Sequence, residues 1–97
     1  MSVYIVGQIE ITDPETFEKY LEQFFPILRK HGGVLLAGAK SETVLVEGEW
    51  ASPKTVVMNF PSKEAAEGWH NDPDYQAIIP IRLSSSKVKL VLVEGFD

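Results

Sequence analysis

Short segments of this chain are apolar on both faces of a strand, and the chain has enough helix to cover only one of those faces. Residues 33–39 carry no polar side chain, and residues 56–60 and 90–93 are nearly as apolar. A half-solvated antiparallel strand should alternate apolar and polar residues, because successive side chains point to opposite faces. These segments do not alternate, so we expect a second body to cover the other face. A second copy of the chain is the simplest candidate, which predicts a homodimer.

The size and the charge of the chain limit the classes of protein to which it can belong. The 97 residues fit a single domain over residues 1–97, with no linker or repeat. A net charge of −5 and scattered basic residues argue against binding to nucleic acid. The absence of cysteine excludes disulfides, a thiolate metal site and a cysteine nucleophile. Residues 1–10 do not resemble a signal peptide, and no apolar run reaches the roughly 20 residues of a spanning helix. We therefore expect a cytoplasmic protein with no membrane partner.

The first helix has the clearest signals of any element. Asp13 can cap free N–H groups, and Pro14 suits the first helical position. Pro26 should bend this helix, because an interior proline costs about 3 kcal/mol. Gly32 permits a left-handed cap, so we expect the helix to end at residues 30–32. The buried stripe should consist of Phe17, Tyr20, Leu21, Phe24 and Leu28.

The remaining elements follow from similar patterns. Ser62 is a suitable N-cap for a short helix, and Asp72 with Pro73 restarts a helix that should fade at residues 84–86. A turn signal before residues 43–47 predicts that they return as an extra strand of a hairpin. The expected strands cover residues 3–11, 33–39, 43–47, 54–60 and 87–94, with a loop at residues 48–53.

This order of elements is the ferredoxin-like arrangement, an α+β fold βαββαβ, here with an extra hairpin strand. The helices should lie on one face of an antiparallel sheet, which leaves the other face without cover from its own chain. Two such sheets packed face to face would bury on the order of 800 Å² per partner. At about 25 cal/mol per Å² this area can hold a permanent dimer, although association entropy offsets much of the gain.

Several residues fall at recognisable places. The most specific run begins at Phe60-Pro61-Ser62, continues through Trp69 and residues 73–76, and ends at Arg82. Because of this run, the chain resembles the domain-of-unknown-function 1330 family over about residues 4–95. The members of this family are small bacterial proteins of the dimeric α+β-barrel superfamily. Lys54 departs from the arginine more often expected there, which weakens a planar carboxylate-binding role at that position. Shorter markers of the family are Tyr20, Pro26, Gly32, Gly33, Glu47, Gly48, Glu49, Trp50, Glu64, Ala65 and Ala66.

The resemblance implies the same fold and the same dimer, and it supplies no activity. Wider members of the superfamily include cofactor-independent monooxygenases, dye- and haem-degrading enzymes, lactone isomerases and ligand-sensing domains. Their sites tend to lie in the cavity between the helices and the sheet. Because fold does not determine function, the resemblance directs attention to that cavity without assigning a reaction.

Polar residues among apolar ones supply the candidate ligand-binding residues. Arg82 follows an apolar stripe, and its guanidinium could clamp a carboxylate or an enolate, or pair with an acid for structure alone. Asn59 interrupts an apolar strand, where either a ligand or the backbone must satisfy its amide. Tyr20 and Tyr75 offer phenolic donors to the same cavity, although aromatic residues at helical spacing also build cores.

Candidate catalytic residues come from one acidic cluster and the two histidines. Glu47 and Glu49 beside Trp50 could bind a cation or supply a general base, with Trp50 as a further ligand-binding residue, or they could form a solvated loop with Trp50 at the dimer edge. His70 could move a proton or simply lie on the surface beside a cap, whereas His31 should cap a helix end. The histidines have no carboxylate at helical metal spacing, so no metal is expected.

Three functions stay open on this basis. No phosphate-binding glycine loop or dinucleotide fingerprint occurs in the sequence, so no cofactor is expected. The first function is a cofactor-independent enzyme, monooxygenase- or isomerase-like, acting on a small aromatic or carbonyl metabolite, with Glu47 or His70 moving a proton. The second is a non-catalytic module that binds or senses a metabolite, and the third is an assembly dimer without ligand. A cavity lined by Arg82 and a perturbed carboxylate or imidazole favours the enzyme, an apolar cavity the binder, and a closed core the assembly.

Overall fold

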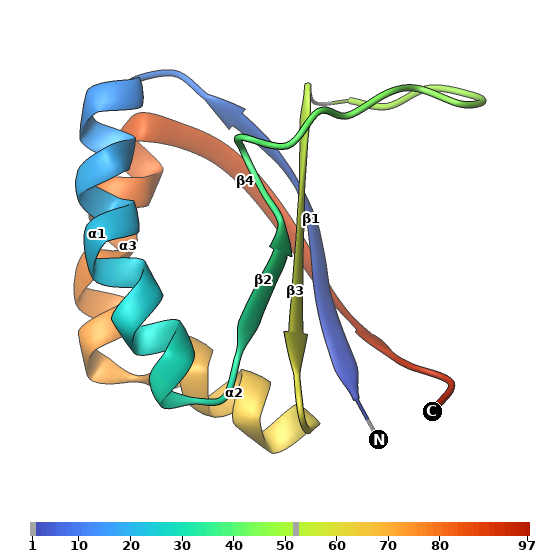
Figure 1. Ribbon diagram of the computed structural model, residues 1–97. Coiled ribbons are helices and arrows are strands. Elements are labelled where there is room, and N and C mark those ends of the chain that lie inside the picture. The colour runs from blue at the N-terminus through green and yellow to red at the C-terminus, as the bar shows by residue number, and fades with distance from the viewer. Residues whose placement is uncertain (1, 52) are drawn as a thin grey trace.

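A computed structural model describes residues 2–51 and 53–97, and within them four strands form one antiparallel sheet with helices on one face (Figure 1). The elements are β1 (Val3–Ile11), α1 (Pro14–Lys30), β2 (Val34–Ala37), β3 (Lys54–Phe60), α2 (Lys63–Asn71), α3 (Pro73–Ser85) and β4 (Ser86–Glu94). The strand order β2-β3-β1-β4 is that of the ferredoxin-like fold, so the predicted fold class is confirmed. Met1 and Ser52, which fall in the predicted N-terminal segment and in the predicted loop, lie outside the described residues.

The helices begin where the sequence predicts, because their caps are local. The Asp13 carboxylate accepts hydrogen bonds from the Thr16 backbone N–H at 3.3 Å and from the Thr16 hydroxyl at 2.7 Å. The Ser62 hydroxyl caps α2 in the same way, 3.1 Å from the Ala65 backbone N–H. α1 continues through Pro26 and is followed by Gly32, whose φ of 75° is the left-handed conformation that glycine adopts without strain.

The predicted extra strand is wrong. Residues 43–47, all of them described, form no strand, and β2 is shorter than predicted. Residues 42–51, which we call the arm, extend from the end of the sheet away from the helices (Figure 1). The arm is exposed throughout most of its length, and Val46 reaches 94% exposure. Strand-forming residues hold a strand only when their backbone pairs with a neighbouring strand, and none of the described strands pairs with the arm, whose Thr43 hydroxyl donates to the Thr55 hydroxyl at 3.1 Å.

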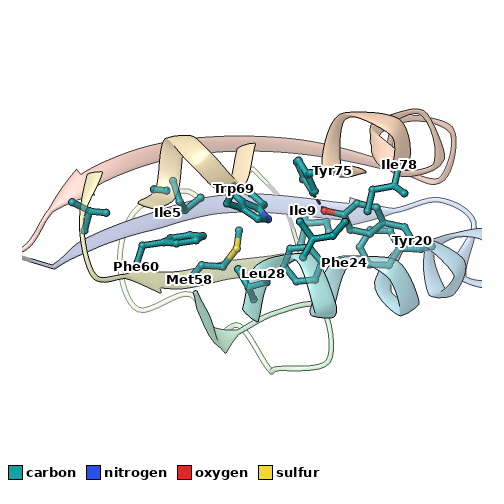
Figure 2. Packing of buried hydrophobic residues seen from close by; sticks show 14 residues of the cluster. Ile5, Ile9, Tyr20, Phe24, Leu28, Met58, Phe60, Trp69, Tyr75 and Ile78 are labelled. Atoms are coloured by element: carbon teal, nitrogen blue, oxygen red, sulfur yellow. Dashed lines mark hydrogen bonds between the residues drawn. The ribbon is translucent and has the colours of Figure 1, made fainter. Parts of the chain in front are cut away.

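The face of the sheet under the helices holds the core. Ile5, Met58 and Leu35 lie opposite one another on adjacent strands. Ile5 and Met58 belong to the buried cluster that includes the aromatic side chains of the helices (Figure 2), and Leu35 packs against that cluster. Gly7 lies two residues after Ile5 in β1. A Cβ at this position would collide with the Leu90 side chain and the Lys89 backbone of β4. The sequence leaves open whether Gly7 marks a bulge or a close approach of backbones; the close approach is present, and the pairing with β3 and β4 passes through Gly7 without a bulge.

The opposite face, which we call the outer face, has no helix of the described chain over it (Figure 1). Its exposed apolar side chains include Val91, which is 60% exposed. The strand registers align outer-face side chains in two rows across the sheet, so the uncovered surface is continuous. One row is Val34, Asn59, Tyr4 and Val93, and the next, wholly apolar, is Val57, Val6 and Val91.

Candidate functional site

A cavity of about 260 Å³ lies between α1, α3 and the covered face of the sheet, next to the β2 edge. Its volume is below the roughly 300–1,000 Å³ of pockets for drug-sized ligands, so it suits a compound of about one or two rings. Most of its wall is apolar. Among the apolar side chains that line it are Phe17, Leu21, Phe24, Leu35, Met58 and Leu90.

Three polar side chains form a connected chain in this wall. Arg82 Nη1 donates a hydrogen bond to the Tyr75 hydroxyl at 3.0 Å, and the Tyr75 and Tyr20 hydroxyls are 2.8 Å apart. Figure 2 shows the two phenols reaching toward each other from α1 and α3, and both are buried. Arg82 Nε is also buried, and no hydrogen-bond partner for it occurs in the described part of the chain. We call Tyr20, Tyr75 and Arg82 the polar triad.

Burial raises the pKa of the Tyr20 phenol far above its ordinary value of 10.0, and the neighbouring Tyr75 adds to this effect. The Arg82 guanidinium acts in the opposite direction and does not overcome the burial. Tyr20 therefore stays protonated near neutral pH. It can donate a hydrogen bond to an oxygen atom in the cavity, and it is a poor general base.

Helix geometry places the triad. Tyr75 and Arg82 are seven residues apart in α3, so two turns of the helix bring them to the same face. Tyr20 lies on the buried stripe of α1, which packs against α3. The start of α3 is fixed by Asp72, whose carboxylate accepts a hydrogen bond from the Asp74 backbone N–H at 2.8 Å.

Asp72 also joins α3 to the end of α1. Its Oδ2 lies 2.7 Å from His31 Nε2 and 3.0 Å from Lys30 Nζ. The hydrogen bond with His31, followed by those from the Asp74 backbone and Lys30, holds the pKa of the Asp72 carboxyl well below its usual range. The sequence predicts Asp72 only as a cap. Its second role depends on helix packing and has no local signal.

The structure brings Tyr20, Tyr75 and Arg82 together and places the other predicted ligand-binding residues elsewhere. Asn59 lies on the outer face, where its amide donates to the Val3 carbonyl at 3.3 Å, the backbone partner considered as its alternative. Trp50 lies in the arm, 45% exposed, and lines a shallow hollow with Gln8. Which face a polar strand residue occupies depends on register, so composition alone does not locate Asn59.

The predicted catalytic residues also lie outside the cavity. Glu47 is exposed in the arm, and His70 is exposed near the end of α2, with its ring centroid 5.9 Å from that of Tyr75. Lys40 and Ser41 do line the cavity, and sequence reasoning missed both. The Lys54 ammonium donates to the Ser41 carbonyl at 3.2 Å, so Lys54 supports the cavity rim.

Two further kinds of feature, a metal site and a membrane-spanning helix, can be judged from the described residues. No group of three or more histidine, aspartate or glutamate side chains there is arranged to hold a metal ion. Within the same residues, no helix combines the length and the apolar character needed to cross a bilayer.

The sheet order and the helices on one face define a ferredoxin-like α+β protein, and solved structures share that fold. RPA0582, a protein of unknown function from Rhodopseudomonas palustris, has a TM-score of 0.79 and 14% identity over 99% of this chain and 83% of its own. SnoaB from Streptomyces nogalater, described as a cofactor-independent oxygenase, has a TM-score of 0.63 and 13% identity over 99% and 94%. A dimeric ferredoxin-like protein of unknown function from Jannaschia sp. CCS1 has a TM-score of 0.63 and 13% identity over 98% and 100%.

The chain belongs to the family named domain of unknown function (DUF1330), whose model matches residues 2–96. The resemblance seen in the sequence is therefore confirmed. No curated protein gives a significant match. The identities to the solved structures are low enough that they establish the fold and leave the function to be argued from the site.

Proposed function

We propose that this protein is a homodimer that binds a small aromatic or carbonyl compound in the cavity between its helices and its sheet. The observation that carries the proposal is the polar triad in the wall of an otherwise apolar cavity. Apolar walls hold a ring, and a few convergent donors fix the position of an oxygen atom. This combination is what a site for a small oxygen-bearing metabolite requires.

Binding is better supported than catalysis by the groups present. Among the described residues that line the cavity there is no carboxylate and no imidazole. Tyr20 is held in its protonated form, so it does not supply a base in their place. The cavity itself argues against an assembly dimer without ligand, because such a protein needs only a closed core.

A cofactor-independent enzyme is the second candidate. A guanidinium with phenolic donors could stabilise the enolate that forms when a proton leaves a carbon next to a carbonyl group. The reaction would be monooxygenase- or isomerase-like, and SnoaB, described as a cofactor-independent oxygenase, is an analogy of fold for the first of these. In this candidate Glu47 or His70 remains the proposed base. Oxygen consumption in the presence of a compound that binds, lost on Arg82→Gln, would support it.

The homodimer is proposed from the outer face and the arm together. The outer face and the arm lie on the side of the molecule away from the helices (Figure 1), and exposed apolar residues of the arm include Val44, Leu45 and Val46. A second copy packed sheet to sheet would cover the rows and give the arm a surface to contact. A cytoplasmic location in a bacterium is part of the same proposal, since a cysteine-free composition is compatible with it.

A thermal-shift screen tests the binding proposal. Small aromatic ketones, phenols, lactones and carboxylates are added to the purified protein, and at least one should raise its melting temperature in a concentration-dependent way. Ala39→Phe, which inserts a ring into the cavity, should abolish the shift. Ala77→Phe is the matched control, because Ala77 is exposed on α3 and the shift should persist. No shift with any compound would refute a ligand-binding function.

A further inference from the structure

The charges in the cavity wall are all of one sign. The chain as a whole has 14 acidic and 9 basic residues, yet Arg82 and Lys40 line the cavity and no aspartate or glutamate does so among the described residues. At the exposed rim of the cavity, Lys40 Nζ lies 3.5 Å from Glu18 Oε1 and forms an ion pair with it. Arg82 makes no ion pair within the part of the chain that the structure describes. Arg82 is half-buried and its Nε is fully buried, and a cation that has lost part of its water without a counter-charge is disfavoured.

The hydrogen bonds in the triad also leave donors unused. A guanidinium has five N–H groups, and the Tyr75 hydroxyl accepts from one of them. The buried Nε has no partner in the described residues. The two phenols carry one proton each and share one hydrogen bond, so one phenolic proton remains whichever hydroxyl donates. A site with spare donors, a net positive charge and no carboxylate among the described residues that line it is complementary to an anion.

We infer that the ligand of this cavity is a small aromatic carboxylate whose carboxylate group lies against Arg82 and the neighbouring phenol. This inference rests on the proposed function, because it names the ligand class of the same cavity. A carboxylate is planar and has two oxygens, so it matches the fork of a guanidinium better than a ketone or a phenol does. The ring of the ligand lies against the apolar walls, and the volume limits it to about one or two rings.

A matched pair of compounds isolates the charge. 2-Naphthoate and 2-naphthamide have nearly the same shape and differ in the charge of one group, so isothermal titration calorimetry on both measures the preference directly. The wild-type protein should bind the carboxylate at least about tenfold more tightly than the amide. In Arg82→Gln this preference should fall to about onefold, with the amide affinity little changed. Arg29→Gln, at an exposed arginine in the last turn of α1, should keep the preference of the wild type.

Arg82→Lys separates charge from shape. It keeps a cation and loses the planar fork, so a preference between those of the wild type and Arg82→Gln is expected. Equal affinity of the wild type for both naphthalene compounds would overturn the inference and leave the proposed function intact. Failure of the wild type to bind these or any screened compound would remove the proposed function itself. A carboxylate preference that survives in folded Arg82→Gln would overturn the assignment to Arg82. The comparison of the two compounds on the wild type decides the matter even where a variant does not fold.

Discussion

Tyr75 is the middle member of the polar triad, so removing its hydroxyl should cost more stability than removing the hydroxyl of Tyr20. Removing the Tyr20 hydroxyl deletes one hydrogen bond and leaves Tyr75 bonded to Arg82. Removing the Tyr75 hydroxyl leaves both neighbours without their partner in a buried place. A lost hydrogen bond costs about 1 kcal/mol, and each stranded buried group costs about 1–3 kcal/mol. Tyr75→Phe should therefore lower the free energy of unfolding by about 2–3 kcal/mol, and Tyr20→Phe by about 1 kcal/mol.

Urea unfolding followed by circular dichroism measures both values. Ser84→Ala is the control, because the Ser84 hydroxyl is exposed on α3 and lies outside both the triad and the outer face, and a change below about 0.5 kcal/mol is expected there. Equal losses for Tyr20→Phe and Tyr75→Phe would contradict the central position of Tyr75. At this scale the sequence predicted Tyr20, Tyr75 and Arg82 because each stands on a helical stripe. It did not place Glu47 or His70, because their surroundings come from distant parts of the chain.

At the scale of the elements, Asp72 connects three helices at one point. Its carboxylate caps α3 and contacts Lys30 and His31 at the end of α1, and its backbone N–H donates to the Trp69 carbonyl at the end of α2. The pKa of Asp72 is lowered in the folded protein. Its ionised form therefore contributes stability that is present above the ordinary aspartate pKa of 3.8, and that stability is lost as the pH falls through the lowered pKa. Asp72→Asn keeps the cap and removes the charge, so it should be less stable than the wild type at pH 7, with the difference shrinking below about pH 4.

Chemical unfolding of both proteins between neutral and acid pH gives this difference directly. Asp13→Asn is the matched control, since Asp13 has the same place before a proline but is exposed and caps only its own helix. At pH 7, Asp13→Asn should lower the free energy of unfolding by less than Asp72→Asn does. A constant difference between wild type and Asp72→Asn across the pH range would contradict the role of the charge.

Helices and strands differ in how far the sequence can predict them, and the arm shows why. The helix starts at Asp13, Ser62 and Asp72 were predicted because capping depends on neighbouring residues. The strand expected at residues 43–47 has suitable composition, but no strand in the described part of the chain pairs with its backbone. Strand formation depends on a partner that is distant in the sequence, so composition alone overestimates it.

For the whole molecule, the apolar outer face is the feature that a single chain leaves unexplained. Val91 lies in an apolar row of that face and is 60% exposed, so lysine there costs little in an isolated chain. In a sheet-to-sheet dimer the same lysine would be buried without a partner, and like charges would meet across the interface. Light scattering should return the mass of two chains for the wild type and of one chain for Val91→Lys. Leu83→Lys is the control, because Leu83 is 66% exposed on α3, away from the sheet, and the dimer should persist. A wild-type mass of one chain at micromolar concentration would contradict the dimer, and the apolar rows would then need another partner.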